Sequence, residues 1–167
     1  MKHLDDSSHR KEDALKCELA AETLRWFGTL RLQVTGHSML PTIWPGDVLL
    51  AQRCDFGGIR PGEIVLYARE SRLVAHRVIS KGAHLEGPFL VTQGDTSPTQ
   101  DSPVSPAEFL GRVSIIIRAG KFYIPVSTLT LQSKLVAIAA RHSTFASRFL
   151  VHRHLTRFDS GGQKTLC

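Results

Sequence analysis

The chain is poor in cysteine and contains no long hydrophobic run, and each absence excludes a class of protein. Its three cysteines, Cys17, Cys54 and Cys167, lie far apart in 167 residues. Disulfide frameworks and zinc sites need several cysteines at short spacing, so we expect free thiols and no metal. No segment approaches the roughly 18 to 20 consecutive apolar residues that cross a bilayer. The N-terminus also lacks the apolar core of a signal peptide, so we expect neither a transmembrane anchor nor a leader.

Acidic residues are missing from the region between Lys121 and Phe158, although the whole chain carries 21 Lys and Arg against 15 Asp and Glu. Apolar residues recur there at helical spacing beside a basic stripe, which predicts a basic amphipathic helix over 125–158. Such a helix could dock on its own domain, bind a partner, or contact an anionic membrane surface through residues 129–150. The polar ends of the chain, residues 1–10 and 159–167, are predicted to be disordered.

The rest of the chain is predicted to form one β-rich domain that follows a short helix. Apolar residues at helical spacing between residues 11 and 28 predict an amphipathic helix that buries Ala20, Leu24 and Phe27 behind Leu15 and Leu19. Gly28 is placed to end this helix. Residues 29–124 then contain seven short strand-like segments punctuated by glycine and proline, which is typical of a barrel or a folded-over sheet. These segments are 30–34, 48–52, 63–68, 73–79, 89–93, 111–118 and 122–124.

Ser38 is the strongest candidate for a nucleophile because it lies in a glycine- and proline-rich segment, GHSMLPTIWPGD, that directly follows a predicted strand. Gly36 would let the backbone turn sharply and approach a substrate, so that the Ser38 amide could face a developing oxyanion. Taken alone, the segment is equally compatible with a rigid connection between two strands.

A serine hydroxyl needs a base within hydrogen-bond reach, and His76 is the best candidate. It lies in an apolar strand, where burial would favour the neutral imidazole that accepts a proton. A strand histidine alone is more commonly a core residue, but two aspartates, Asp95 and Asp101, follow it. Either carboxylate could orient the imidazole and stabilise its protonated form.

These residues lie in four motifs that, in this order, resemble the type I signal peptidase superfamily, which also includes LexA-type repressors. Gly36–Asp47 resembles the nucleophile box, and Val74–Ile79 resembles the box of the general base. The chain has histidine in this second box, as the endoplasmic-reticulum and archaeal signal peptidases do, where bacterial enzymes have lysine. Val91–Asp95, with Asp101 six residues later, is similar to the third box, and Gly111–Val113 resembles the strand that closes the domain.

The resemblance implies a mainly β, signal-peptidase-like catalytic domain over 29–124, flanked by short N- and C-terminal helices and without cofactor or metal. It implies that Ser38 is the nucleophile, His76 the general base and Asp101 the third member. Asp95 would support the site, and Met39 would help to shape the substrate pocket. Several family members carry a serine at the position of Gly36 to complete the oxyanion hole, so its absence predicts slow or narrowly specific activity.

Three functions follow as hypotheses. The leading one is a serine endopeptidase that cleaves an extended peptide or preprotein after small residues, working in the cytoplasm or peripherally at a membrane surface. A second is a dedicated processing protease that cuts a small cytoplasmic precursor or itself. The third is a non-catalytic regulatory or binding module of the same fold. No helix-turn-helix pattern precedes Ser38, so we expect no nucleic-acid partner.

Overall fold

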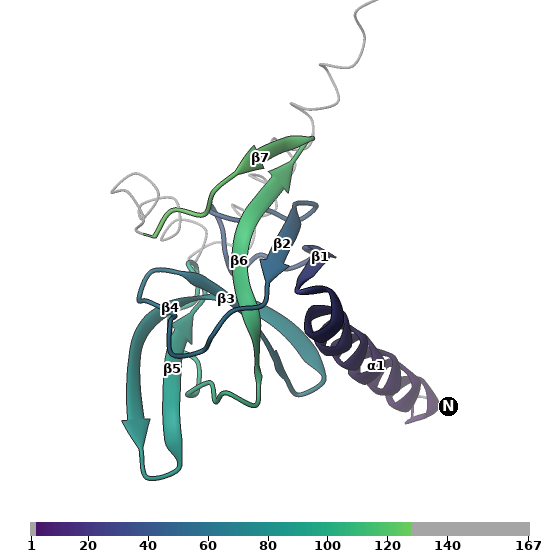
Figure 1. The fold of residues 1–167 in the computed structure, drawn as a ribbon. Helices are drawn as coiled ribbons and strands as arrows, with labels where there is room; N and C mark the ends of the chain where they lie inside the picture. The colour runs from purple at the N-terminus through teal and green to yellow at the C-terminus, as the bar shows by residue number, and fades with distance from the viewer. Residues whose placement is uncertain (1–2, 128–167) are drawn as a thin grey trace, which may run out of the picture.

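Seven antiparallel strands and one helix make up residues 3–127, the part of the chain that this computed structural model describes (Figure 1). The prediction of a mainly β fold is therefore confirmed. The predicted basic helix and the C-terminal 159–167 segment lie outside the described residues, apart from 125–127, which are irregular. In chain order the elements are α1 (His3–Phe27), β1 (Thr29–Gln33), β2 (Val48–Gln52), β3 (Ile64–Arg69), β4 (Arg72–His84), β5 (Gly87–Gln93), β6 (Phe109–Arg118) and β7 (Lys121–Tyr123).

All seven strands coincide with segments whose apolar residues alternate with polar ones or form a short apolar run. The strand β2 alternates between buried and half-buried positions, whereas four consecutive residues of β3 are buried. A strand buried on both faces is expected to read as an apolar run rather than as an alternation. The strand β4 is longer than its predicted 73–79 core because its polar second half continues into a hairpin with β5.

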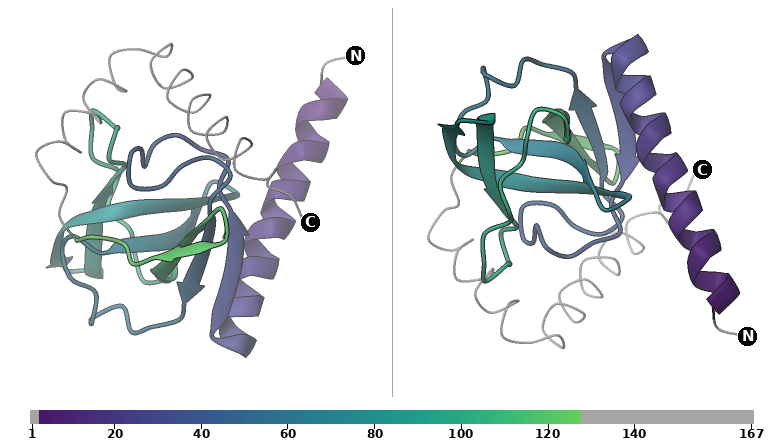
Figure 2. Two further views of the ribbon diagram at one scale, coloured as in Figure 1. Left: turned by 90° about the horizontal axis from the view of Figure 1, so that it is seen from above. Right: turned by 90° about the horizontal axis from the view of Figure 1, so that it is seen from below.

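The sheet bends around β6, which lies at its centre. Its strand order is β1-β2-β6-β3-β4-β5, and β7 also pairs with β6. One edge of β6 pairs with β2, while the other pairs with β3 near its start and with β7 near its end. Register shifts interrupt the β2–β6, β3–β6 and β4–β5 ladders, and such bulges increase twist and curvature. The resulting sheet is folded over rather than flat (Figure 2).

The helix α1 packs on one side of the sheet beside β1, and its N-terminal end projects beyond the strands (Figures 1 and 2). It begins at His3 rather than near Lys11, so the expectation that residues 1–10 lie outside any helix was wrong. As predicted, the helix ends before Gly28, whose φ of 71° and bond to the Leu24 carbonyl cap it.

The buried face of α1 matches the predicted one at Ala20 and Leu24 but not at Phe27. Cys17, Ala20 and Leu24 are buried, whereas Leu15 and Phe27 are 53% and 77% exposed. Leu24 packs with Ala51 and Leu66 of the sheet. The small side chains of Cys17 and Ala20 let the helix backbone approach the strands closely, and Cys17 takes the buried place that the sequence assigned to Phe27.

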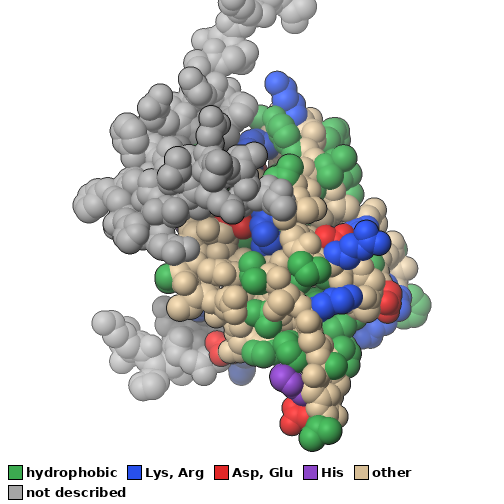
Figure 3. Space-filling model, turned by 90° about the vertical axis from the view of Figure 1, so that its left-hand side faces the viewer, with side chains coloured by type: hydrophobic (Ala, Val, Ile, Leu, Met, Phe, Trp, Pro, Cys, Tyr) green, Lys and Arg blue, Asp and Glu red, His purple; other side chains and the backbone are tan. Residues whose placement is uncertain are grey.

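The described surface carries charges of both signs. On the face that includes the β4–β5 hairpin, basic, acidic and hydrophobic side chains are interspersed (Figure 3). Within the described residues, no helix combines the length and the apolar character that a membrane crossing requires.

Candidate active site

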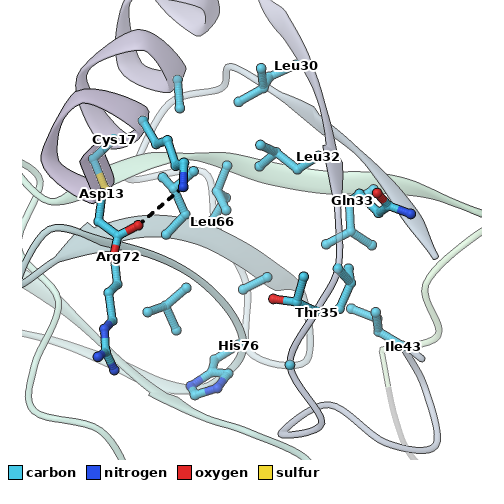
Figure 4. A pocket seen from close by; sticks show the side chains of 18 of the residues that line it. Asp13, Cys17, Leu30, Leu32, Gln33, Thr35, Ile43, Leu66, Arg72 and His76 are labelled. Atoms are coloured by element: carbon cyan, nitrogen blue, oxygen red, sulfur yellow. Dashed lines mark hydrogen bonds and ion pairs between the residues drawn. The ribbon is translucent and has the colours of Figure 1, made fainter. Parts of the chain in front are cut away.

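A cavity of about 1000 Å³ lies between the first strand, the start of β4 and the helix α1. Ser38 and His76 border it, and His76 lies at the end away from α1 (Figure 4). Most of its lining is aliphatic, with contributions from Leu30, Leu32, Val34, Met39, Ile43, Leu49, Leu66, Leu73, Val74 and Ala75. Its polar lining includes Asp13 and Lys16 of α1, which form an ion pair. The cavity therefore offers a largely aliphatic surface beside a hydroxyl and an imidazole.

The loop that carries Ser38 is anchored by its own apolar residues and by a second loop. Met39 and Ile43 are buried in the core cluster of Leu49, Ile64, Val113 and Ile116. The Thr96 amide donates to the Ser38 carbonyl at 2.9 Å, and the Thr96 hydroxyl donates to it at 3.0 Å. A Cβ built on Gly94 would lie only 2.8 Å from that carbonyl oxygen. The segment after β5 thus contacts the Ser38 backbone closely and holds the Ser38 carbonyl in position.

Ser38, His76 and Asp101 form one chain of hydrogen bonds. The Ser38 Oγ lies 2.9 Å from His76 Nε2, and His76 Nδ1 lies 2.7 Å from Asp101 Oδ2. An ionised carboxylate only accepts, so Nδ1 carries the proton and Nε2 is free to accept the Ser38 proton. The His76 side chain is 12% exposed. This tautomer and order of contacts are those of a serine nucleophile activated by an oriented imidazole.

Asp101 has two further side-chain partners. The Thr92 hydroxyl lies 2.7 Å from Asp101 Oδ2, and the Tyr67 hydroxyl lies 3.2 Å from the same oxygen. The Asp101 amide also donates to the Thr92 carbonyl at 2.8 Å. Burial raises the pKa of Tyr67 to about 12, so this phenol remains a proton donor at neutral pH.

Asp95 faces a different partner from Asp101. Its carboxylate accepts two bonds from Arg77, one from Nε at 2.8 Å and one from a terminal nitrogen at 3.0 Å. The side chains of Arg77 and Asp95 are 7% and 2% exposed, and the Thr42 hydroxyl also donates to Asp95. Because Thr42 belongs to the Ser38 loop and Arg77 follows His76, this buried pair connects the two segments that must meet.

A second ion pair fixes the far end of the same loop. Arg118 donates to both oxygens of Asp47, at 2.9 and 2.6 Å, and to the Thr42 carbonyl at 3.0 Å. The Trp44 amide donates to Asp47 as well. Bidentate contacts between arginine and carboxylate restrict geometry more than a single bond does. The loop from Ser38 to Asp47 is consequently held at its middle and at its end.

The segment after Asp101 is secured by Arg69. This guanidinium bonds Glu108 at 2.7 Å and the carbonyls of Ser102 and Pro103 at 2.8 Å each. The hydrogen bond from Arg69 holds the pKa of Glu108 well below its usual range, at about 2. Glu108 is therefore ionised at neutral pH, and the pair restrains the loop in which Asp101 lies.

Four of the predicted site residues, Gly36, Ser38, Met39 and His76, line the cavity, and Asp101 joins them through its contact with His76. The φ of Gly36 lies outside the left-handed region that favours glycine. A Cβ at Gly36 would have no neighbour within 4 Å. Glycine is thus not required there by backbone conformation or by space, and its approach to a substrate stays a prediction.

Sequence reasoning missed four residues that hold this arrangement. Arg77 and Thr42 pair with Asp95, and Thr92 and Tyr67 contact Asp101. One signal was available: an arginine inside an apolar strand needs a buried partner, and an aspartate at the end of the next strand could supply it. Thr92 and Tyr67 gave no such signal because threonine and tyrosine are common in strands.

No metal site is suggested by the described part of the chain, where no three His, Cys, Asp or Glu side chains are grouped suitably. Cys17 and Cys54 are free thiols, and Cys167 lies outside the described residues. Comparisons with family models and with curated proteins found no match to this chain. The interpretation of the site therefore depends on its geometry and on the sequence motifs.

Proposed function

We propose that the chain is a serine endopeptidase similar to the histidine branch of the signal peptidases, cleaving an extended peptide during preprotein or precursor processing. The observation that carries this proposal is the chain of contacts Ser38 Oγ to His76 Nε2 at 2.9 Å and His76 Nδ1 to Asp101 Oδ2 at 2.7 Å. These contacts border an apolar cavity that a substrate can enter.

In the proposed reaction, His76 Nε2 removes the Ser38 proton while Ser38 Oγ attacks the scissile carbonyl carbon. Asp101 stabilises the imidazolium, which then protonates the leaving amine. Water hydrolyses the resulting Ser38 ester with His76 again as the base. The Ser38 amide would supply one oxyanion donor, whereas Gly36 has no side chain to supply a second. We therefore expect a slower enzyme than one that has both donors.

Two unpaired strand edges support an extended substrate. Among the described residues, β1 pairs only with β2, and residues 72–76 of β4 pair only with β3. Both segments contribute to the lining of the cavity. Peptides commonly bind such free edges as an added strand, with backbone bonds for affinity and pockets for side chains. The resemblance adds the expectation that small residues precede the scissile bond.

The test is cleavage of peptides that carry alanine at the first and third positions before the scissile bond, followed by mass spectrometry. Wild type should cut them, while Ser38→Ala and His76→Ala should not. The matched control is Ser114→Ala, which removes a hydroxyl that bonds the Leu50 carbonyl in the sheet and not the site. Cleavage that persists unchanged in Ser38→Ala would refute the assignment.

A further inference from the structure

The Asp101 carboxylate has two side-chain hydrogen-bond partners besides the His76 imidazole. Three side chains converge on its Oδ2 atom: His76 and Thr92 at 2.7 Å each and Tyr67 at 3.2 Å. The Thr92 carbonyl additionally accepts the Asp101 amide. Thr92 is therefore hydrogen-bonded to Asp101 through both its backbone and its side chain.

The strand register explains why these hydroxyls reach Asp101. Tyr67 on β3 lies opposite Val74 of β4, and Thr92 on β5 lies opposite Val78 of β4. His76 lies midway between these two valines, so the pleat places Tyr67, His76 and Thr92 on one face of three neighbouring strands. The Tyr67 and His76 rings are 6.4 Å apart in an edge-on arrangement.

Each of the Thr92 and Tyr67 hydroxyls has a single proton, which shows the direction of its hydrogen bond. Thr92 has one hydroxyl proton, and the 2.7 Å contact with Asp101 is far shorter than its 3.4 Å contact with Tyr67. Thr92 thus donates to the carboxylate, and the Tyr67 proton is left to point to Asp101 as well. Both side chains are almost fully buried, at 0% and 2% exposed, so water does not compete for these bonds.

We propose that Thr92 and Tyr67 are positioning residues that fix the Asp101 carboxylate so that a single oxygen faces His76 Nδ1. This inference rests on the proposed peptidase function. Without the Thr92 hydroxyl, the carboxylate can rotate about its side-chain bonds, and the imidazole loses its fixed orientation toward Ser38. The other titratable groups near this carboxylate are Arg69, whose guanidinium lies 5.4 Å from the Tyr67 ring centre, and its partner Glu108.

The experiment compares Thr92→Val, which removes the hydroxyl at nearly constant shape, with Thr92→Ser, which keeps it. We expect Thr92→Val to lower kcat/KM about ten- to hundredfold and Thr92→Ser to restore most of it, because bonds to charged groups are strong. Tyr67→Phe should lose about two- to tenfold, since its contact is longer.

The pH profile separates positioning from a loss of folded protein. A carboxylate that has lost a donor attracts the imidazolium more strongly, so the rise of kcat/KM with pH should move to higher pH in Thr92→Val. A folding defect alone would lower the rate at every pH and leave the midpoint in place. Unchanged kcat/KM and midpoint in Thr92→Val would overturn the inference.

A second measurement does not depend on activity. The His76 Nδ1 proton should give a low-field NMR resonance, assigned by its loss in His76→Gln. We expect this resonance to broaden or shift in Thr92→Val and to persist in Thr92→Ser. If wild type cleaves no peptide yet the resonance responds in this way, the proposed function fails while the positioning of the imidazole stands. A resonance identical in wild type and Thr92→Val would overturn the positioning role.

Discussion

Replacing Gly94 by alanine is a small change that should displace Ser38, the proposed nucleophile, without altering its side chain. A Cβ at this position would lie 2.6 Å from Ser97 Oγ, 2.8 Å from the Ser38 carbonyl oxygen and 3.0 Å from Ser38 Cβ. The Ser97 side chain can change its rotamer, whereas the Ser38 carbonyl belongs to the backbone and is held by the Thr96 amide. Relief of the clash must therefore move one loop relative to the other.

The size of the displacement follows from these distances. Ordinary contacts between heavy atoms lie at about 3.5 Å or more, so the Ser38 carbonyl must retreat by roughly 0.7 Å. Overpacking of this kind costs about 1–3 kcal/mol of stability. A misplacement of about 1 Å at a reacting group costs about a hundredfold in rate. We therefore expect Gly94→Ala to lose about 30- to 100-fold in kcat/KM and to unfold at a lower temperature.

Peptide cleavage and thermal unfolding should be measured on the same preparations, with Gly58→Ala as the matched control. A Cβ at Gly58 would meet Asp55 only at the ordinary distance of 3.5 Å, and Gly58 lies outside the cavity lining. This control should keep both activity and stability. If Gly94→Ala instead cleaves the peptide as fast as wild type, the segment after β5 does not hold Ser38 in place, and the reasoning fails.

Further variants test the other contacts of the site. Gly36→Ser should raise kcat/KM at least about tenfold if the new hydroxyl reaches the oxyanion, with no loss of stability, because the position is open. Asp95→Asn should lower the free energy of unfolding by about 3–5 kcal/mol in denaturant titrations, since it removes the carboxylate that balances the buried Arg77 charge. Asp101→Asn should lower kcat by about 10⁴ with a much smaller loss of stability, as the orienting carboxylate of a triad does. The lowered pKa of Glu108 means that its pair with Arg69 stabilises the fold above about pH 4.5 and is lost toward about pH 2. The loss should be on the order of 1 kcal/mol and absent in Glu108→Gln.

Much of the fold was predictable because its strands are short, apolar and separated by glycine and proline. The strand β2 was placed with the correct bounds, and β6 was placed within two residues. The helix α1 was harder: Ala20 and Leu24 are buried as predicted, but Phe27 is exposed and Cys17 is buried instead. The helical period alone does not show which neighbouring residue faces the sheet.

The candidate nucleophile and base could be identified from sequence because each occupies a distinctive motif. The residues alone left the choice between Asp95 and Asp101 open, since both follow β5 and both are plausible partners for an imidazole, and only the family resemblance favoured Asp101. The roles of Thr92 and Tyr67 depend on the pairing of β3, β4 and β5, and pairing across strands is not encoded in any single segment.

The two aspartates have separate roles because His76 and Arg77 are adjacent in one strand. Successive residues of a strand point to opposite faces, so the imidazole and the guanidinium cannot share a carboxylate. The loop after β5 supplies one to each face: Asp101 to His76 and Asp95 to Arg77. Arg77 also reaches Thr42 in the Ser38 loop. The buried Arg77–Asp95 pair therefore links the strand of His76 to the loop of Ser38, and Asp101 remains available to bond the His76 imidazole.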